Sequence, residues 1–237
     1  MITLPLSYLE RHLFVEVQGQ KWLLDTGFPT TFGNSTSLRL GGDEYPVANS
    51  GMGITVDALT EHVPVEMVGL LGMDVLGQYD FVLDLPNHRL LLSREPIERE
   101  GVTLDLDEYM DVPLVHATVR GQELRMFLDT GAMISFLQKD LVSDLEPVGS
   151  FVDFYPMHGT FETPLFELEH ELGGVRFVAS AGVLPEFLNL MLSLAGADGV
   201  LGNQFLVQRP VLLSLRNRVA VLLDPHPKDE GGPEAAP

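Results

Sequence analysis

Leu24-Asp25-Thr26-Gly27 and Leu128-Asp129-Thr130-Gly131 decide the fold, because the same four residues end the same kind of segment twice. The first copy follows His12-Leu-Phe-Val-Glu-Val-Gln-Gly-Gln-Lys-Trp-Leu-Leu, and the second follows Leu114-Val-His-Ala-Thr-Val-Arg-Gly-Gln-Glu-Leu-Arg-Met-Phe-Leu. Apolar residues on both sides of Gly19 and Gly121 predict two strands joined by a tight turn. Each copy is therefore predicted to be a β-hairpin that runs into Asp-Thr-Gly.

A second motif repeats further along the chain. Gly69-Leu-Leu-Gly72 matches Gly199-Val-Leu-Gly202 at an offset of 130 residues, and the same offset relates Asn87 to Asn217. Each Asn is predicted to lie in a turn between two apolar strands. One register held over this distance indicates two copies of one structural unit.

The two copies differ in length at one place. Asp25 and Asp129 are 104 residues apart, whereas Leu40-Gly41-Gly42 and Leu172-Gly173-Gly174 are 132 apart. The second copy therefore carries about 28 extra residues, near residues 138–165. We expect the extra segment to contain a hairpin with Gly159 at its tip.

The predicted fold is mostly β, with two lobes related by a pseudo-two-fold axis and short helices at residues 56–62 and 185–192. We place the first lobe at residues 1–100 and the second at 101–224, with the boundary in the charged stretch around Pro96. Residues 225–237 are rich in Pro, Gly and Glu and are predicted to be a disordered tail.

Composition restricts the partners and the location. The formal net charge of -20 argues against binding to nucleic acid or to an anionic membrane surface. The absence of cysteine excludes thiol nucleophiles and thiolate metal sites. We recognise neither a signal peptide nor an apolar stretch of transmembrane length, and expect a cytoplasmic protein.

With these motifs in place, the sequence resembles the aspartic peptidase family over nearly its whole length, up to Asp224. The resemblance is to retropepsins in particular, because each copy is only about 100 residues long. In that family two halves pair about a two-fold axis, so that one loop from each half reaches the same point. The resemblance implies an aspartic endopeptidase that acts as a monomer without a cofactor or metal.

The implied catalytic residues are Asp25 and Asp129. Two carboxyl groups about 3 Å apart cannot both ionise, so one takes a proton from water while the other donates one to the peptide carbonyl. Thr26 and Thr130 are expected to lock the two loops together. Gly27 and Gly131 are expected to let backbone amides reach the carboxylates, and Gly72 and Gly202 to lie under the loops where a side chain has no room.

The substrate is expected to be a peptide or protein segment in extended conformation, covered by a mobile hairpin or flap. The second lobe offers a candidate flap near residues 151–166, with Tyr155, His158 and Gly159 as candidate substrate contacts. A plain surface hairpin remains an alternative there. The first lobe is expected to have a shortened flap or none.

The sequence departs from the family after each Asp-Thr-Gly, where Phe28 and Ala132 replace the usual Ser, Thr or Ala. Both are candidate cleft residues, and neither can donate a hydroxyl hydrogen bond, a bond that would favour ionisation of the dyad. We therefore expect activity nearer neutral pH than in pepsins. Met73 and Asn203 replace charged residues that often follow the apolar-Gly motif in retroviral enzymes.

Two alternatives remain open. A bulky Phe28 beside the catalytic loop and the missing first flap favour a non-catalytic peptide-binding module of the same fold. A structural or regulatory protein that dimerises through the cleft is the other. The scattered histidines show no metal-ligand spacing, and the sequence has no Gly-x-Ser-x-Gly or nucleotide-binding glycine loop.

Overall fold

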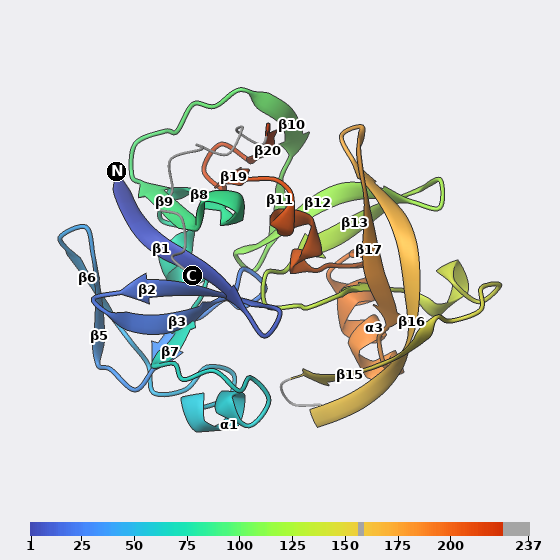
Figure 1. Ribbon diagram of the computed structural model, residues 1–237, viewed down its shortest axis with the longest axis horizontal. Coiled ribbons are helices and arrows are strands. Elements are labelled where there is room, and N and C mark those ends of the chain that lie inside the picture. Colours follow the sequence, from blue (N-terminus) through green and yellow to red (C-terminus); the bar gives the residue numbers. More distant parts are fainter. Residues whose placement is uncertain (156–158, 225–237) are drawn as a thin grey trace, which may run out of the picture.

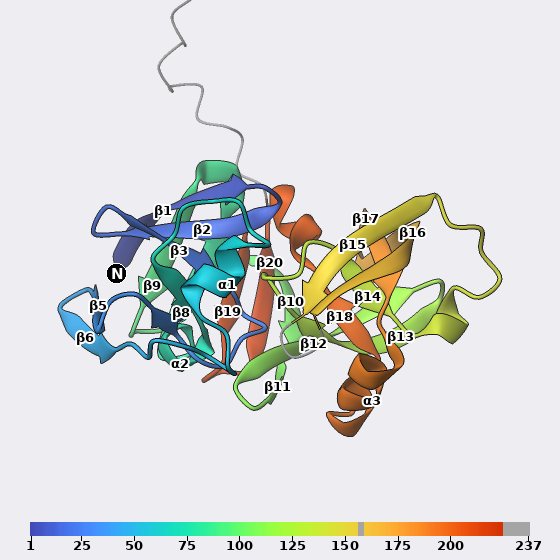
Figure 2. The same ribbon diagram turned by 90° about the horizontal axis from the view of Figure 1, so that it is seen from below.

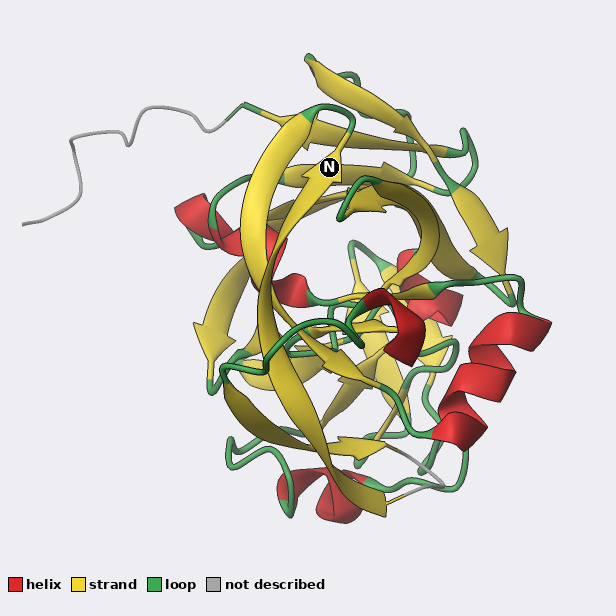
Figure 3. Cartoon of the chain, turned by 90° about the vertical axis from the view of Figure 1, so that its right-hand side faces the viewer, coloured by secondary structure: helices red, strands yellow, loops and turns green. Residues whose placement is uncertain are grey.

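The computed structural model describes residues 1–155 and 159–224, and most of its regular structure is β-strand (Figure 3). In the first half of the chain the strands are β1 (Ile2–Leu9), β2 (His12–Val17), β3 (Gln20–Leu24), β4 (Phe32–Gly33), β5 (Ser37–Leu40), β6 (Asp43–Pro46), β7 (Gly69–Leu71), β8 (Asp80–Asp84) and β9 (Arg89–Ser93). Its helical elements are α1 (Val56–Thr60), α2 (Met73–Leu76) and the 3-10 turn η1 (Leu85–Asn87).

The second half follows the same plan. Its strands are β10 (Gly101–Asp105), β11 (Asp107–Tyr109), β12 (Val112–Val119), β13 (Gln122–Leu128), β14 (Ser135–Leu137), β15 (Gly149–Tyr155), β16 (Gly159–Leu172), β17 (Val175–Val183), β18 (Gly199–Leu201), β19 (Val211–Ser214) and β20 (Val219–Leu223). The helical elements are η2 (Lys139–Leu141), α3 (Glu186–Leu194) and η3 (Asn203–Val207). Figure 1 shows the two halves side by side as two lobes.

The repeated hairpins form as the sequence predicts. The β2–β3 turn has positive φ at Gln18 (53°) and Gly19 (77°), and the β12–β13 turn has nearly the same values at Arg120 (53°) and Gly121 (76°). Two successive positive φ angles define the type I′ turn, whose twist matches that of antiparallel strands. The same local chemistry therefore builds both hairpins.

The apolar-Gly motifs lie beside the hairpins as parallel strands. In the first lobe Leu24 of β3 pairs with Leu71 of β7, and in the second Leu128 of β13 pairs with Leu201 of β18. These strands are largely buried on both faces, which explains why they are short and continuously apolar. The pairings place the end of each hairpin next to the residue that precedes the last Gly of the motif.

The two lobes share one sheet. A ten-stranded sheet runs β10-β20-β19-β8-β9-β1-β2-β3-β7-β4, and an eight-stranded sheet runs β11-β12-β13-β18-β14-β17-β16-β15. Where β8 meets β19, Val82 pairs with Leu212, flanked by Phe81 with Leu213 and Leu83 with Val211. The 130-residue offset matches Phe81 with Val211 and Leu83 with Leu213, so it carries each flanking pair onto the other. A local two-fold axis therefore passes through the central pair.

The lobes differ most around the extra segment of the second copy. The β5–β6 turn uses Gly41 (φ 57°) and Gly42 (φ 99°), and the β16–β17 turn uses Gly173 (φ 54°) and Gly174 (φ 87°), so these two hairpins correspond. β16 has 14 residues, however, whereas β5 has 4. The additional length of β16 pairs with β15.

The fold class predicted from the sequence is confirmed: the chain is mostly β, with two lobes, pseudo-two-fold pairing and short helices. The helices predicted at 56–62 and 185–192 are α1 and α3, and the sequence did not predict α2. The bounds of the lobes stay a prediction, and the tail at 225–237 lies outside the described residues. Within the described chain, helices of the length and hydropathy needed to span a bilayer are absent.

One cluster of buried side chains continues from lobe to lobe. It includes Leu13 and Phe81 of the first half and Val115, Leu201 and Leu213 of the second, all of them 0% exposed. Each such side chain contributes about 1.5–3 kcal/mol through its removal from water. The core therefore holds the lobes, and the loops between them, in a fixed relation.

Candidate active site

The two Asp-Thr-Gly loops meet between the lobes. The backbone N–H of Asp25 donates to Leu71 O (3.1 Å), and that of Asp129 donates to Leu201 O (3.0 Å), so the apolar-Gly strand of each lobe fixes its own Asp. A methyl group added at Gly27 would collide with the Asp129 carboxylate, and one added at Gly131 would collide with that of Asp25. Each glycine thus permits the opposite carboxylate to approach.

The threonines of the two loops exchange hydrogen bonds across the interface. Thr26 N–H donates to Thr130 Oγ1 (2.9 Å), and Thr130 N–H donates to Thr26 Oγ1 (3.0 Å). The hydroxyl groups then donate onwards, from Thr26 to Leu128 O (2.6 Å) and from Thr130 to Leu24 O (2.9 Å). Both threonines are 0% exposed, so the four bonds form a closed link between the lobes that is shielded from solvent.

Backbone amides surround each carboxylate. Gly27 N–H donates to Asp25 Oδ1 (2.9 Å), and Gly131 and Ala132 N–H donate to Asp129 Oδ1 (2.8 and 3.2 Å). The Phe28 amide also bonds to Asp25. Residues 28 and 132 therefore supply backbone donors in place of the hydroxyl that they lack.

The two carboxyl groups titrate together. Burial raises the pKa of Asp25 well above its ordinary value, and the nearby charge and hydrogen bond of Asp129 raise it further. Burial also raises the pKa of Asp129, against the opposing effect of the bond from Asp25 and the two amides. The pair is therefore expected to hold one proton between its members over a range of pH in which isolated carboxyl groups are fully ionised.

The apolar-Gly motifs support the loops from below. A methyl group at Gly72 would lie 2.7 Å from Phe28 O, and one at Gly202 would lie 2.9 Å from Ala132 O, so neither position has room for a side chain, as predicted. Gly72 N–H donates to Thr31 Oγ1 (3.0 Å), and Gly202 N–H donates to Ser135 Oγ (3.2 Å). These two hydroxyls, for which the sequence carries no distinctive signal, tie each motif to its own loop.

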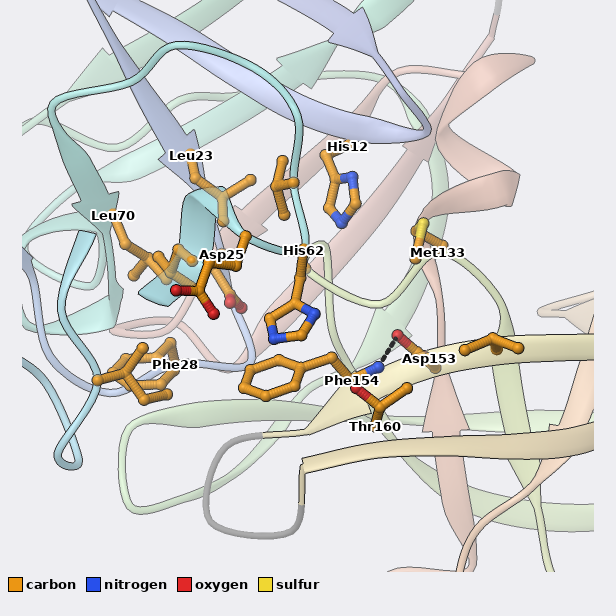
Figure 4. A pocket seen from close by; sticks show the side chains of 16 residues that line it. His12, Leu23, Asp25, Phe28, His62, Leu70, Met133, Asp153, Phe154 and Thr160 are labelled. Carbon is orange, nitrogen blue, oxygen red and sulfur yellow. Dashed lines mark hydrogen bonds between the residues drawn. The ribbon is translucent and has the colours of Figure 1, made fainter. Parts of the chain in front are cut away.

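A cleft of about 290 Å³ lies next to the dyad (Figure 4). Its first-lobe wall is mainly apolar, and its other wall comes from β15, from the start of β16 and from the second Asp-Thr-Gly loop. The lining residues are His12, Leu23, Asp25, Phe28, Ile54, Leu59, Glu61, His62, Val63, Leu70, Gly131, Met133, Val152, Asp153, Phe154 and Thr160.

The β15–β16 hairpin extends across this cleft to the first lobe. The ring of Phe154 stacks on that of His62, which follows α1, with 3.8 Å between centroids and 13° between planes. Arg11, in the β1–β2 turn, lies over the ring of Phe151 at 5.0 Å. Figure 2 shows α1 and β15 on the same side of the molecule.

The candidate flap residues have different positions. Tyr155 ends β15 and is 40% exposed, and its pKa is raised by burial and by the charges of Asp129 and Asp25. Gly159 (φ 86°) begins β16 opposite Tyr155, rather than standing alone at the tip. His158 lies outside the described residues.

Phe28 packs into the first-lobe core beside the cleft. Its ring is 7% exposed and packs on Phe32, with 5.5 Å between centroids, and it forms part of the apolar wall of the cleft. Ala132 is partly exposed beside Asp129 and is not part of the cleft lining. The bulk of Phe28 is therefore accommodated by the first-lobe core.

Asn203 is a site residue whose importance the sequence did not reveal. Its Nδ2 donates to Thr130 O (3.1 Å) and to Arg11 O (2.9 Å), and its Oδ1 accepts from the Tyr8 hydroxyl (3.2 Å). It is 0% exposed. One amide thus joins the second Asp-Thr-Gly loop to the first lobe, while the corresponding Met73 is a buried apolar residue. The signal in the sequence was the difference between the two copies, since Asn203 is polar where the matching Met73 is apolar.

Among the described residues, no group of three or more His, Asp or Glu side chains is placed to hold a metal ion.

No family model and no curated protein matches this sequence. Among solved structures, the chain is similar to the solution structure of Simian Foamy Virus (mac) protease, with 18% identity and a TM-score of 0.29. The match covers 38% of this chain and 86% of that chain. At this TM-score the likeness bears on neither the fold nor the activity of the present protein.

Proposed function

We propose that this protein is an aspartic endopeptidase that hydrolyses peptide bonds between its two lobes, with Asp25 and Asp129 as the catalytic pair. The observation that carries the proposal is the meeting of two carboxyl groups, each held by its own loop, beside a cleft. Burial raises the pKa of both carboxyl groups, and the proximity of Asp129 raises the pKa of Asp25 further. A catalytic acid and base need pKa values displaced in this way to act near neutral pH.

The proposed chemistry needs only the pair and a water molecule. The ionised carboxylate removes a proton from water as the water oxygen attacks the peptide carbonyl carbon, while the protonated carboxyl donates to the carbonyl oxygen. The C–N bond of the resulting gem-diol then breaks as the carboxyl that took the proton from water gives it to the amide nitrogen. The other carboxylate takes a proton from a gem-diol hydroxyl as the new carbonyl forms, which restores the one-proton pair. The proton belongs to the pair, so neither residue is assigned as the acid.

The substrate is proposed to be an extended peptide or protein segment lying in the cleft, with the protein acting as a monomer. β15 is the last strand of the eight-stranded sheet, and three of its residues, Val152, Asp153 and Phe154, line the cleft. A free strand edge can bind an extended peptide through backbone hydrogen bonds. The Thr26–Thr130 exchange joins both loops within one chain, which supports a complete site in each molecule.

A non-catalytic peptide-binding module is the second candidate. The observation that favours it is the asymmetry of the lobes, since β5 is short and only the second lobe carries a long hairpin over the cleft. Such a module would bind extended peptides at the same cleft without hydrolysing them.

The test is cleavage of a mixed peptide library from pH 3 to 8, read by mass spectrometry. The parent is compared with Asp25→Asn, Asp129→Asn and the matched control Asp105→Asn, which changes an exposed carboxylate in β10. We expect the parent and the control to cleave and both dyad variants to be inactive. A parent that binds peptides or a statine-containing inhibitor without cleavage at any pH would establish the binding module instead.

A further inference from the structure

The cleft beside the dyad combines apolar and acidic side chains. Much of its first-lobe wall is apolar and includes Leu23, Ile54 and Leu70. Across from it, β15 places the carboxylate of Asp153 in the lining. None of the lining residues is Lys or Arg, whereas three of them, Asp25, Glu61 and Asp153, are acidic.

Asp153 has a polar partner but no ionic one in the described part of the chain. One carboxylate oxygen accepts the Phe154 N–H at 2.8 Å (Figure 4), and no cationic side chain lies within ion-pair distance. Arg11 is near enough for its charge to lower the pKa of Asp153, but its guanidinium lies over the Phe151 ring. A partly buried carboxylate without a cation is unfavourable, and a cationic ligand group would relieve this cost.

Asp153 also lines the same cleft as the dyad. The lining that contains its side chain includes Asp25 and Gly131, which belong to the two Asp-Thr-Gly loops. A peptide held at the dyad would thus pass close to the Asp153 carboxylate.

We propose that Asp153 makes the site selective for peptides that carry a lysine or arginine side chain close to the scissile bond. This inference rests on the proposed peptidase function and assigns its substrate class. The methylene groups of such a side chain can lie along apolar surface while its charged end reaches a carboxylate. The formal net charge of -20 would also attract cationic peptides from a distance.

The selectivity should depend on pH. Burial raises the pKa of Asp153 to about 6, and the charge of Asp129 acts in the same direction. The carboxylate is therefore largely neutral at pH 4.5 and ionised at pH 7.5, and only the ionised form attracts the cation strongly. The other titratable or charged groups facing this region are His12, His62, Glu61, Tyr155, Arg11 and the dyad.

The test uses pairs of peptides that differ by one residue, lysine or the uncharged norleucine, at positions flanking a bond that the library experiment identifies. The measured quantity is the ratio of kcat/KM for the two members at pH 4.5 and 7.5. We expect the parent to favour lysine about tenfold or more at pH 7.5, the size of one charge-assisted hydrogen bond. Asp153→Asn should bring the ratio to within about twofold of unity, and the parent's ratio should fall at pH 4.5.

The matched control is Glu162→Gln, which removes an equal charge from the neighbouring strand, opposite Val152, outside the cleft lining. It should keep the parent's ratio, which separates a contact at the site from a change in overall charge. If Asp153→Asn fails to fold, as judged by circular dichroism, Asp153→Ser takes its place.

A second measurement separates this proposal from the peptidase proposal. The affinity of Asp25→Asn for the lysine and norleucine peptides, measured by calorimetry, does not require cleavage. A lysine preference in binding, with no cleavage by the parent, would support the role of Asp153 and refute the peptidase. Equal ratios in the parent and Asp153→Asn, or no preference for lysine in either measurement, would overturn the present inference.

Discussion

Replacing Thr26 by Val should cost about 3 kcal/mol of unfolding free energy. The change keeps the shape of the side chain but leaves two buried groups without partners, the Thr130 N–H and Leu128 O, which now bond to the hydroxyl at 3.0 and 2.6 Å. An unsatisfied buried group costs about 1–3 kcal/mol, so two of them give about 2–6 kcal/mol. Small shifts of the loops would partly relieve the two unsatisfied groups, so the expected value lies in the lower half of that range.

Thr26→Ser and Thr60→Val are the comparisons that isolate the hydroxyl. The serine keeps both hydrogen bonds and loses one methyl group, at a cost of about 1 kcal/mol. Thr60 is exposed on α1, and its replacement by valine should change stability by less than about 0.5 kcal/mol. Thr130→Val should match Thr26→Val, because the two hydroxyls have equivalent partners.

The assay is urea unfolding with linear extrapolation, followed through the fluorescence of Trp22. This is the one tryptophan of the chain, and it is 1% exposed in the first-lobe core. A cost for Thr26→Val no larger than that for Thr60→Val would refute the conclusion that the exchange holds the lobes together. So would equal costs for the serine and valine variants at position 26.

Three further predictions concern the supports and the charge of the site. Gly202→Ala should destabilise the fold by about 2 kcal/mol or more in the same unfolding assay, because the new methyl group would overlap the backbone at Ile134 and Ala132; a midpoint equal to the parent's would contradict this. Asp25→Asn should stabilise the protein by an amount that grows as pH rises above about 4, the pKa of an unfolded Asp. The reason is that a raised folded pKa makes the parent lose stability above the pKa of the unfolded carboxyl. Unfolding curves at several pH values measure this, and a constant difference would count against it. Asn203→Leu should lower kcat and shift the pH–rate profile, because Thr130 O and Arg11 O both lose their donor; a change in stability with an unaltered profile would limit Asn203 to a purely structural role.

The repeated elements could be predicted because their determinants are local. Each of these elements leaves a pattern in neighbouring residues: a type I′ turn at Gly19 or Gly121, a short apolar strand, and a glycine at the end of that strand. The Asp-Thr-Gly that ends each predicted hairpin then placed Asp25 and Asp129 in equivalent loops. The lack of room for side chains at Gly72 and Gly202 was predicted on the same basis, and the structure confirms it.

The remaining features of the site depend on contacts between residues far apart in the chain. Asn203 meets Tyr8 and Arg11, which precede it by 195 and 192 positions, and Phe154 meets His62 across the cleft. Such pairs leave no periodic signal in either segment. The orientation of the Phe28 ring was hidden for a similar reason, since the core that receives it is formed by Phe32 and residues of the following loop and α1.

The pairing of β8 with β19 has a consequence for synthesis on the ribosome. Val82 cannot pair with Leu212 until the ribosome has added 130 more residues. At about 5–20 residues per second this delay is about 7–26 seconds. Until then the Phe-Val-Leu segment of β8 is an apolar strand edge, open to pairing with other nascent chains. The strand that joins the finished lobes is therefore the segment on which a chaperone would have most effect.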